Sequence, residues 1–125
     1  MLKEFYKKDS VEEPVRDLVS RRILANHGGL MIVEVYFHKA SEDYALHTHP
    51  HEQVAYVLKG SFEFLIQDTG EKCILSQGDS IYFVPNSVHG GKPLEDDSVL
   101  LDVFTPQRDD FLAQRKDFME KNKGV

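Results

Sequence analysis

Apolar and polar residues alternate with a period of two over most of the chain. Five runs have strand character: 30–37, 53–58, 61–66, 80–84 and 98–104. A period of two puts successive side chains on opposite faces, so these runs predict β-strands. Gly- and Asp-containing turns separate them at short intervals, and this pattern is typical of a β-sandwich or barrel.

Two of these runs carry more local information. The run 30–37 (LMIVEVYF) is almost wholly apolar and β-branched or aromatic, which predicts a strand covered on both faces. The runs 53–58 and 61–66 flank Lys59 and Gly60. We predict a hairpin turn there, because Gly adopts positive φ without strain.

The two ends of the chain differ from this β-rich middle. Residues 1–18 are charged and predict an N-terminal arm, after which residues 19–105 would form the barrel. In the segment 106–125 the apolar residues recur at helical spacing: Phe111, Leu112, Phe118 and Met119. We expect this short C-terminal helix to pack on the barrel or on a partner subunit, with peptide binding as the alternative.

Composition narrows the class of protein. The chain has 125 residues, 21 acidic and 15 basic, for a net charge of −6. One domain of this size is expected, and nucleic-acid binding is disfavoured because phosphate contacts need clustered Lys and Arg. The one cysteine, Cys73, cannot form an internal disulfide and is expected as a buried strand residue in a reducing cytoplasm. No apolar run suits a signal peptide or a membrane span, so we expect a soluble protein without membrane contact.

Three histidines and a glutamine suggest a metal site. His47 and His49 would share one strand face, roughly 7 Å apart. Gln53 follows closely, and His89 comes forty residues after His49. Neutral imidazoles suit zinc, nickel, cobalt or iron, and manganese is also open, so we expect a divalent transition metal. The alternative is a site whose polar residues are only hydrogen-bonded to one another.

The spacing of these residues resembles the cupin superfamily. Its first motif is an H-x-H, three or four residues, Glu, six residues and Gly. Here His47 and His49 are followed by three residues, Gln53, six residues and Gly60. Gln therefore replaces the customary Glu. An uncharged fourth ligand leaves the ion's charge less compensated, which would make it a stronger Lewis acid. It also departs from the two-His-one-carboxylate set of many iron oxygenases.

The second cupin motif is also present. It runs from Gly78 to His89 over the usual eleven residues, with Pro85 one place later than is customary. The resemblance implies an all-β fold, the double-stranded β-helix (jelly-roll barrel) of cupins.

Four stretches in order resemble the KdgF family of small pectin-degradation cupins: RRILANHGGLMIVEV, HTHPHEQVAYVLKG, GDSIYFVPNSVHG and LLDVFTPQRDDFL. Members of that family act on 4,5-unsaturated uronates, the monomers left by pectin and alginate lyases, and speed their conversion to the linear, ketonised form. The resemblance thus implies an enzyme acting on a small sugar acid. It also implies a homodimer, because small cupins commonly pair through strand edges.

Asp102, Phe104 and Arg108 are the candidate catalytic residues. A carboxylate in the middle of the apolar run VLLDVF is costly to bury unless it is paired. One interpretation is a buried Asp102–Arg108 ion pair that holds the C-terminal segment down. The other, which the KdgF resemblance favours, is that Asp102 carries a proton and Arg108 binds an anionic group in a bidentate contact. Phe104 would then form a wall for the sugar ring or simply fill the core.

Two neighbours of the histidines stay open. Ala55 shares the strand face of Gln53, where its small side chain either leaves room for a ligand or fills the core. We expect His51 near the mouth of the barrel, because Pro50 interrupts the alternation. As to function, the alternatives to a uronate enzyme are another metal cupin enzyme, an oxygenase or sugar isomerase, and a non-catalytic sugar-acid-binding module.

Overall fold

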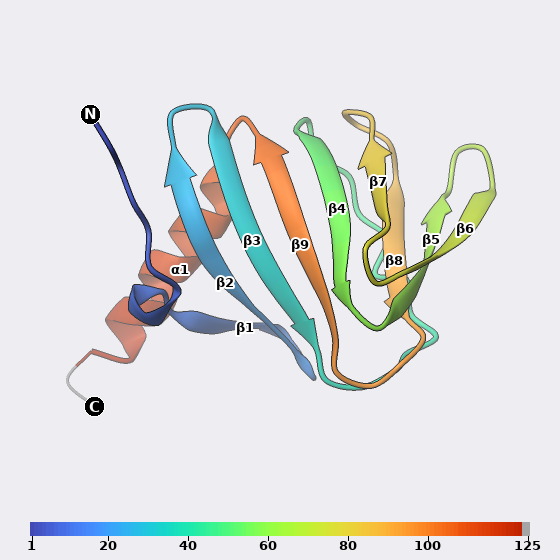
Figure 1. Ribbon diagram of the computed structural model, residues 1–125, viewed down its shortest axis with the longest axis horizontal. Helices are drawn as coiled ribbons and strands as arrows, with labels where there is room; N and C mark the ends of the chain where they lie inside the picture. The colour runs from blue at the N-terminus through green and yellow to red at the C-terminus, as the bar shows by residue number, and fades with distance from the viewer. Residues whose placement is uncertain (124–125) are drawn as a thin grey trace.

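A computed structural model describes residues 1–123 and contains two antiparallel sheets that face each other (Figure 1). The larger sheet has six strands in the order β1-β2-β3-β9-β4-β7. Their bounds are β1 Glu12–Arg16, β2 Val19–His27, β3 Leu30–Phe37, β9 Ser98–Thr105, β4 Glu52–Lys59 and β7 Ser80–Phe83. The smaller sheet, in the order β6-β5-β8, comprises β6 Glu71–Ser76, β5 Ser61–Ile66 and β8 His89–Pro93. The predicted all-β jelly-roll barrel is therefore confirmed.

The alternation seen in the sequence places the core between the two sheets. Ala55 and Val57 of β4 are fully buried, and Phe62 and Phe64 of β5 face them from the smaller sheet. Strand β3 alternates as well, so one of its faces is buried and the other is only half-buried, whereas the sequence predicted cover on both faces. Cys73 on β6 packs, half-buried, against this core as a free thiol.

The predicted hairpin at Lys59–Gly60 is wrong. β4 pairs with β7 and β9 in the larger sheet, whereas β5 pairs with β6 and β8 in the smaller one. Gly60, with φ +79°, is instead the corner at which the chain passes from one sheet to the other. Two strands joined by a short turn resemble a hairpin in sequence, because local patterning does not reveal which partners each strand finds.

The first eighteen residues are more ordered than the predicted arm. A 3₁₀ turn, η1 (Lys7–Asp9), is followed by β1, which adds to the edge of the larger sheet beside β2. Buried pairing explains this order: Glu13 of β1 is 1% exposed and accepts two hydrogen bonds from Arg21 of β2. Glu13 of this charged segment is therefore buried and paired with Arg21, whereas the charge pattern alone predicts that it is exposed to solvent.

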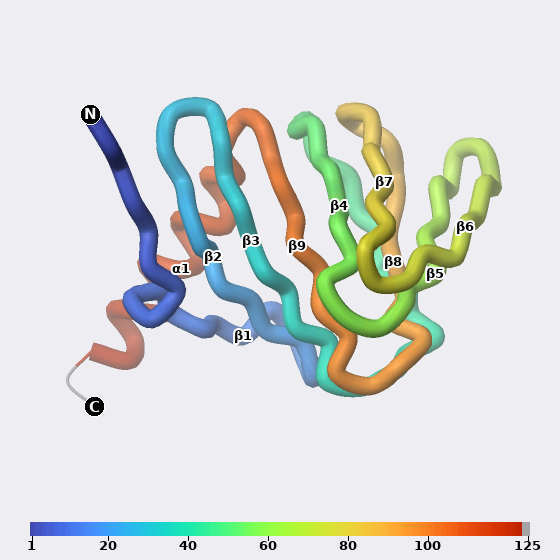
Figure 2. The backbone as a smooth tube through the Cα atoms, viewed as in Figure 1, coloured from blue at the N-terminus to red at the C-terminus, as the bar shows by residue number. Residues whose placement is uncertain are grey.

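The C-terminal segment forms one helix, α1 (Asp109–Lys121), which lies behind β2 and β3 at the same end of the molecule as the N-terminal segment (Figures 1 and 2). Phe111 and Leu112 pack against the core residues Met31 and Phe104, whereas Met119 stays 49% exposed. Packing on the barrel is thus confirmed for the first turn of the helix. The last two residues of the predicted 106–125 segment lie outside the described residues. No helix within residues 1–123 is both long and apolar enough to span a bilayer.

Candidate metal centre and cavity

Backbone pairing brings the first and last candidate ligands together. His47 precedes β4 and His89 begins β8, and each donates its backbone N–H to the other's carbonyl oxygen at 2.9 Å. Directly paired residues of antiparallel strands project to the same side. The two imidazole rings accordingly lie with centroids 4.6 Å apart, although the residues are far apart in the sequence.

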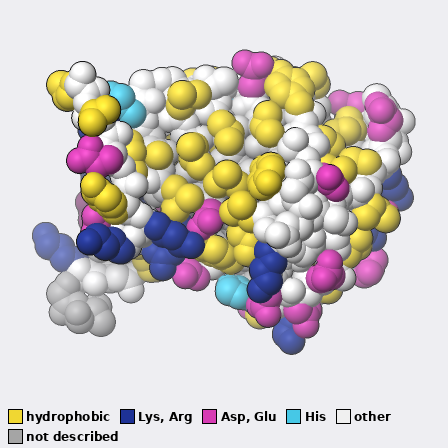
Figure 3. Space-filling view, in the orientation of Figure 1, with side chains coloured by type: hydrophobic (Ala, Val, Ile, Leu, Met, Phe, Trp, Pro, Cys, Tyr) yellow, Lys and Arg dark blue, Asp and Glu magenta, His cyan; other side chains and the backbone are white. Residues whose placement is uncertain are grey.

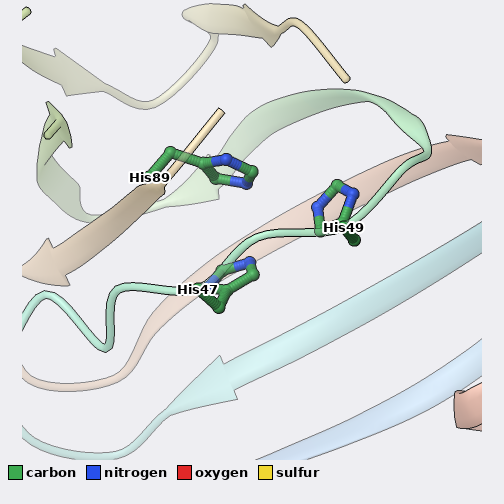
Figure 4. Close-up of side chains that lie close together, drawn as sticks. All are labelled: His47, His49 and His89. Carbon is green, nitrogen blue, oxygen red and sulfur yellow. The ribbon is translucent and has the colours of Figure 1, made fainter. Parts of the chain in front are cut away.

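His49 completes a cluster of three imidazoles, as predicted (Figure 4). Its ring centroid lies 5.5 Å from that of His47 and 4.9 Å from that of His89. One nitrogen of each ring falls within 4.8 Å of the others. The ring of Phe83 on β7 stacks on His89 at 4.1 Å and fixes its orientation.

Gln53, the fourth predicted ligand, reaches the same point from β4. Its Oε1 lies 3.0 Å from Nε2 of His49 and 3.2 Å from Nε2 of His89. Its Nε2 donates a hydrogen bond to Oδ1 of Asp102 at 3.0 Å. The amide therefore turns its oxygen toward the imidazoles and its nitrogen toward the carboxylate.

The hydrogen bonds of the rings test whether this set suits a cation. His47 Nδ1 donates to the Ala45 carbonyl at 2.9 Å, and His89 Nδ1 donates to the Ser87 carbonyl at 3.0 Å. In neutral rings those bonds leave both Nε2 atoms unprotonated. Nε2 of His89 then faces Oε1 of Gln53 at 3.2 Å with no proton between two acceptors. A shared cation would relieve that contact, so the residues fit a metal ion.

The pKa values also favour neutral rings. Burial and, to a lesser extent, the neighbouring His47 lower the pKa of His89 to about 4. Burial likewise lowers the pKa of His47 and of His49, with the Arg108 charge adding to the effect in both. Neutral imidazole is the form that binds a metal ion.

Three of the four candidate ligands, His47, Gln53 and His89, line a cavity of about 290 Å³ between the two sheets. Asp102 and Phe104 of β9 and Ala55 of β4 line it as well, because all three point inward from neighbouring strands. Asp102 is 8% exposed, and its burial raises the pKa of the carboxyl to about 7, against the Gln53 hydrogen bond and the Arg108 charge. The volume is near the lower end for small-molecule pockets and suits one sugar ring.

Arg108 lies at the edge of this cavity, held by its own neighbours. Its Nε and Nη2 donate to the two carboxylate oxygens of Asp110 at 3.0 and 2.8 Å. The guanidinium lies over the rings of Phe104 and Phe111, at 5.0 and 4.0 Å. Within residues 1–123 Arg108 forms no ion pair with Asp102, so the predicted alternative of a structural Asp102–Arg108 pair is wrong.

Phe104 and His51 lie next to the imidazole cluster, one in the core and one beside His49. Phe104 is 2% exposed, belongs to the core cluster with Met31 and Val33, and also lines the cavity. It therefore fills the core, and its role as a wall for a sugar ring stays a prediction. His51 lies beside the cluster, with its ring 5.4 Å from His49 and 6.4 Å from Phe104. It is not among the three histidines whose nitrogens converge.

Comparison with known proteins agrees with this geometry. The cupin domain family matches residues 33–104, which hold all four candidate ligands. The chain belongs to the cupin family. It is 42% identical over 113 residues to the pectin degradation protein KdgF of Dickeya dadantii (strain 3937), an alignment that covers 90% of this chain and 100% of that protein. Membership of the family of small KdgF-like cupins is thereby shown.

Two solved structures of cupins resemble it throughout. KdgF from Halomonas sp. superposes with a TM-score of 0.79 and 34% identity, covering 87% of this chain and 99% of that one. An RmlC-like cupin from Shewanella frigidimarina gives a TM-score of 0.77 and 31% identity over 89% of this chain and 96% of its own.

Sequence reasoning missed several residues of this cavity. Tyr44, in the loop before His47, lines it, as do Arg21 and Arg16 from the segment around β1 and β2. Phe83 carried a usable signal, because it alternates with Ile81 toward the inner face of β7. Arg16 carried none, since its segment was predicted to be an arm.

Proposed function

We propose that this cupin is a metal-dependent enzyme that promotes ring opening and ketonisation of 4,5-unsaturated uronates from pectin or alginate breakdown. The observation that carries the proposal is the series of side-chain contacts from His49 through Gln53 to Asp102. It joins the imidazole cluster to a buried carboxyl that lines a sugar-sized cavity. The relative named as a pectin degradation protein supports the substrate class.

Asp102 is proposed as the proton carrier. Opening the ring removes the proton of the hydroxyl at C1 and breaks the bond from C1 to the ring oxygen, which gives an aldehyde and an enol. Ketonisation then moves the enol proton to C4. A carboxyl with a pKa near 7 can both accept and return a proton at neutral pH. Gln53 keeps Oδ1 of this carboxyl in place, so Oδ2 is the atom that we assign to the substrate.

A bound divalent transition metal (zinc, nickel, iron, cobalt or manganese) would be held by His47, His49, His89 and Gln53 and would supply Lewis-acid polarisation of a substrate oxygen. Phe104 offers an apolar wall for the ring. Arg108 adds positive charge, and its Nη1 is the nitrogen left for an anionic group, because Asp110 occupies Nε and Nη2.

The test follows loss of the conjugated ultraviolet absorbance of fresh unsaturated galacturonate. Wild type, Asp102→Ala, Arg108→Ala and a chelated sample are compared in parallel, and turnover should be fast only in wild type. Equal rates in all four would remove the enzymatic function. Turnover that needs oxygen would indicate an oxygenase, and normal ligand binding without turnover a sugar-acid-binding module.

We also propose that two copies pair, and that they do so through the outer face of the larger sheet and not through the strand edges expected from the sequence. Apolar side chains gather on this face over β3, β9 and β4 (Figure 3). One row across the sheet, set by the strand register, is uncharged throughout: Ile32, Val103, Val54 and Tyr82. Strand dimensions give a plane of roughly 500 Å². A standard interface buries ~800 Å² per partner, so this face would supply the larger part of one. A second copy presents the same uncharged row, which makes it the matching occupant.

A further inference from the structure

A bulge in β1 turns Arg16 toward the inside of the barrel. The pairing of β1 with β2 runs Pro14 with Ser20 and then Arg16 with Val19, so Val15 is the extra residue. Without the bulge, Val15 would be the partner of Val19. Bulges redirect side chains in this way, often beside binding sites.

The register and one contact place Arg16 on the cavity side of β1. Val19, its register partner, is 9% exposed and belongs to the core. The Arg16 guanidinium carbon lies 5.9 Å from the ring centroid of Phe37, a core residue that lines the same cavity as the imidazoles. Arg16 also lines this cavity, while its own side chain remains exposed to solvent.

Arg16 differs from the other two arginines of the cavity in having no partner. Arg21 donates to Glu13 at 3.1 and 2.7 Å and to Gln114 at 2.6 Å. Arg108 donates from Nε and Nη2 to the two carboxylate oxygens of Asp110. Arg16 has no ion pair in the part of the chain that the structure describes. It is therefore the cavity arginine whose whole donor fork is available.

The two ends of the cavity are set by the inner row of β9. Leu100 pairs with Val35 near the Phe37 end, and Phe104 pairs with Met31 at the Arg108 end. Four residues of strand separate them, about 13 Å. Asp102 lies midway, so a sugar ring beside Asp102 has Arg16 toward one end and Arg108 toward the other.

We propose that Arg16 is a specificity-determining residue that binds the carboxylate of the sugar acid, in a bidentate contact that Arg108 cannot make while Asp110 occupies its fork. A planar guanidinium with a free edge matches a carboxylate in this way. The inference rests on the proposed function for its ligand class. It adds bidentate recognition of the carboxylate at β1 to the positive charge that Arg108 contributes from the C-terminal segment.

The experiment measures binding of D-galacturonate and of its uncharged methyl ester to the metal-loaded protein by calorimetry. The variants are Arg16→Ala, Arg16→Lys and, as a matched control, Arg115→Ala, which removes the same charge from α1 away from the cavity. Within residues 1–123 the side chain of Arg16 makes no ion pair, so Arg16→Ala should fold normally. Turnover of unsaturated galacturonate is recorded on the same samples.

Arg16→Ala should weaken galacturonate binding by about tenfold or more, as expected for a lost charge-assisted pair. Arg16→Lys should retain part of the affinity, ester binding should be unchanged, and Arg115→Ala should match wild type. Acid binding equal in wild type and Arg16→Ala, or no acid binding by wild type, overturns the proposal. Weakened acid binding in Arg16→Ala without turnover in any sample, wild type included, would support Arg16 and instead refute the enzymatic function.

Discussion

Gln53 occupies a position where the type of side chain decides the chemistry. Its amide presents an acceptor to the imidazoles and a donor to Asp102 at the same time. A carboxylate has acceptors only when ionised, so Glu at this position would face Asp102 with like charge. The presence of Gln in place of the usual cupin Glu is thus matched by the presence of Asp102 on the neighbouring strand.

Gln53→Glu should therefore make the protein more dependent on metal. Without metal, two buried carboxyl groups would compete for one proton, and loss of the present hydrogen bond should lower the free energy of unfolding by roughly 1–3 kcal/mol. With metal, the added negative charge should tighten binding. The increase in Tm on adding metal should then be larger in the variant than in wild type.

Gln67→Glu is the control, because it adds the same charge at an exposed position beyond β5. Differential scanning calorimetry of chelated and metal-loaded samples gives the metal-induced shift in Tm for each of the three proteins. An equal metal-induced shift in wild type and Gln53→Glu would contradict this account of the site.

Asp102→Asn separates proton transfer from positioning. Asn still offers an Oδ1 that accepts from Gln53, so the ligand geometry and the metal content should be retained. It cannot carry the proton, and kcat should fall by roughly two to three powers of ten. Elemental analysis and the ultraviolet assay measure the two quantities. Unchanged kcat would mean that Asp102 only positions Gln53.

At the level of elements, the corner at Gly60 joins the two sheets on which the cavity depends. A Cβ built there would overlap Ser98 Oγ and lie 2.9 Å from Ser98 Cβ, and φ is +79°. Gly70, between β5 and β6, has a similar φ of +73° but nothing within 4 Å of such a Cβ. An alanine at Gly70 would therefore meet backbone strain alone, whereas an alanine at Gly60 would meet both backbone strain and steric overlap with Ser98.

Gly70→Ala should lower the free energy of unfolding by about 1–2 kcal/mol, the cost of the left-handed conformation. Gly60→Ala should cost a further 1–3 kcal/mol, roughly, because Ser98 is fully buried and cannot move aside freely. Urea denaturation of both variants gives the difference. Equal losses would show that the corner relaxes around the added methyl group.

Elements whose pattern is local were predictable from the sequence, and pairings between distant residues were not. The run 30–37 coincides with β3, and 61–66 with β5, because period-two alternation records which face is buried. The convergence of Gln53 with the three histidines was predictable from the spacing of the cupin motifs. The sheet change at Gly60 could not emerge, since both a hairpin and a corner need a turn with positive φ. Strand β1 was missed because its burial depends on the Glu13–Arg21 pair, which joins two segments whose charges each look solvent-exposed.

On the scale of the whole molecule, the two faces of the larger sheet have different chemistry. The inner face carries Gln53 and Asp102 toward the cavity, while the outer face carries Val54 and Tyr56 into solvent, at 37% and 38% exposure. Antiparallel sheets with one solvated face normally carry polar residues there. The apolar row on the outer face plays no part in the cavity and is the surface that the proposed dimer would cover.

Val54→Glu should convert the proposed dimer into a monomer. Val54 lies at the centre of the uncharged row, between Val103 and Tyr82, so in a two-fold interface its substitution would bury two uncompensated carboxylates. Sedimentation velocity from about 1 to 100 μM should give a dimer for wild type and a monomer for the variant. Ile74→Glu, on β6 of the other sheet and 62% exposed, makes the same change on a surface outside the proposed interface and should remain dimeric. A monomeric wild type across this range, or a Val54→Glu variant that still dimerises, would exclude the outer face as the contact. The fold of the variant should be unaffected in either case, because Val54 already faces solvent in the isolated chain.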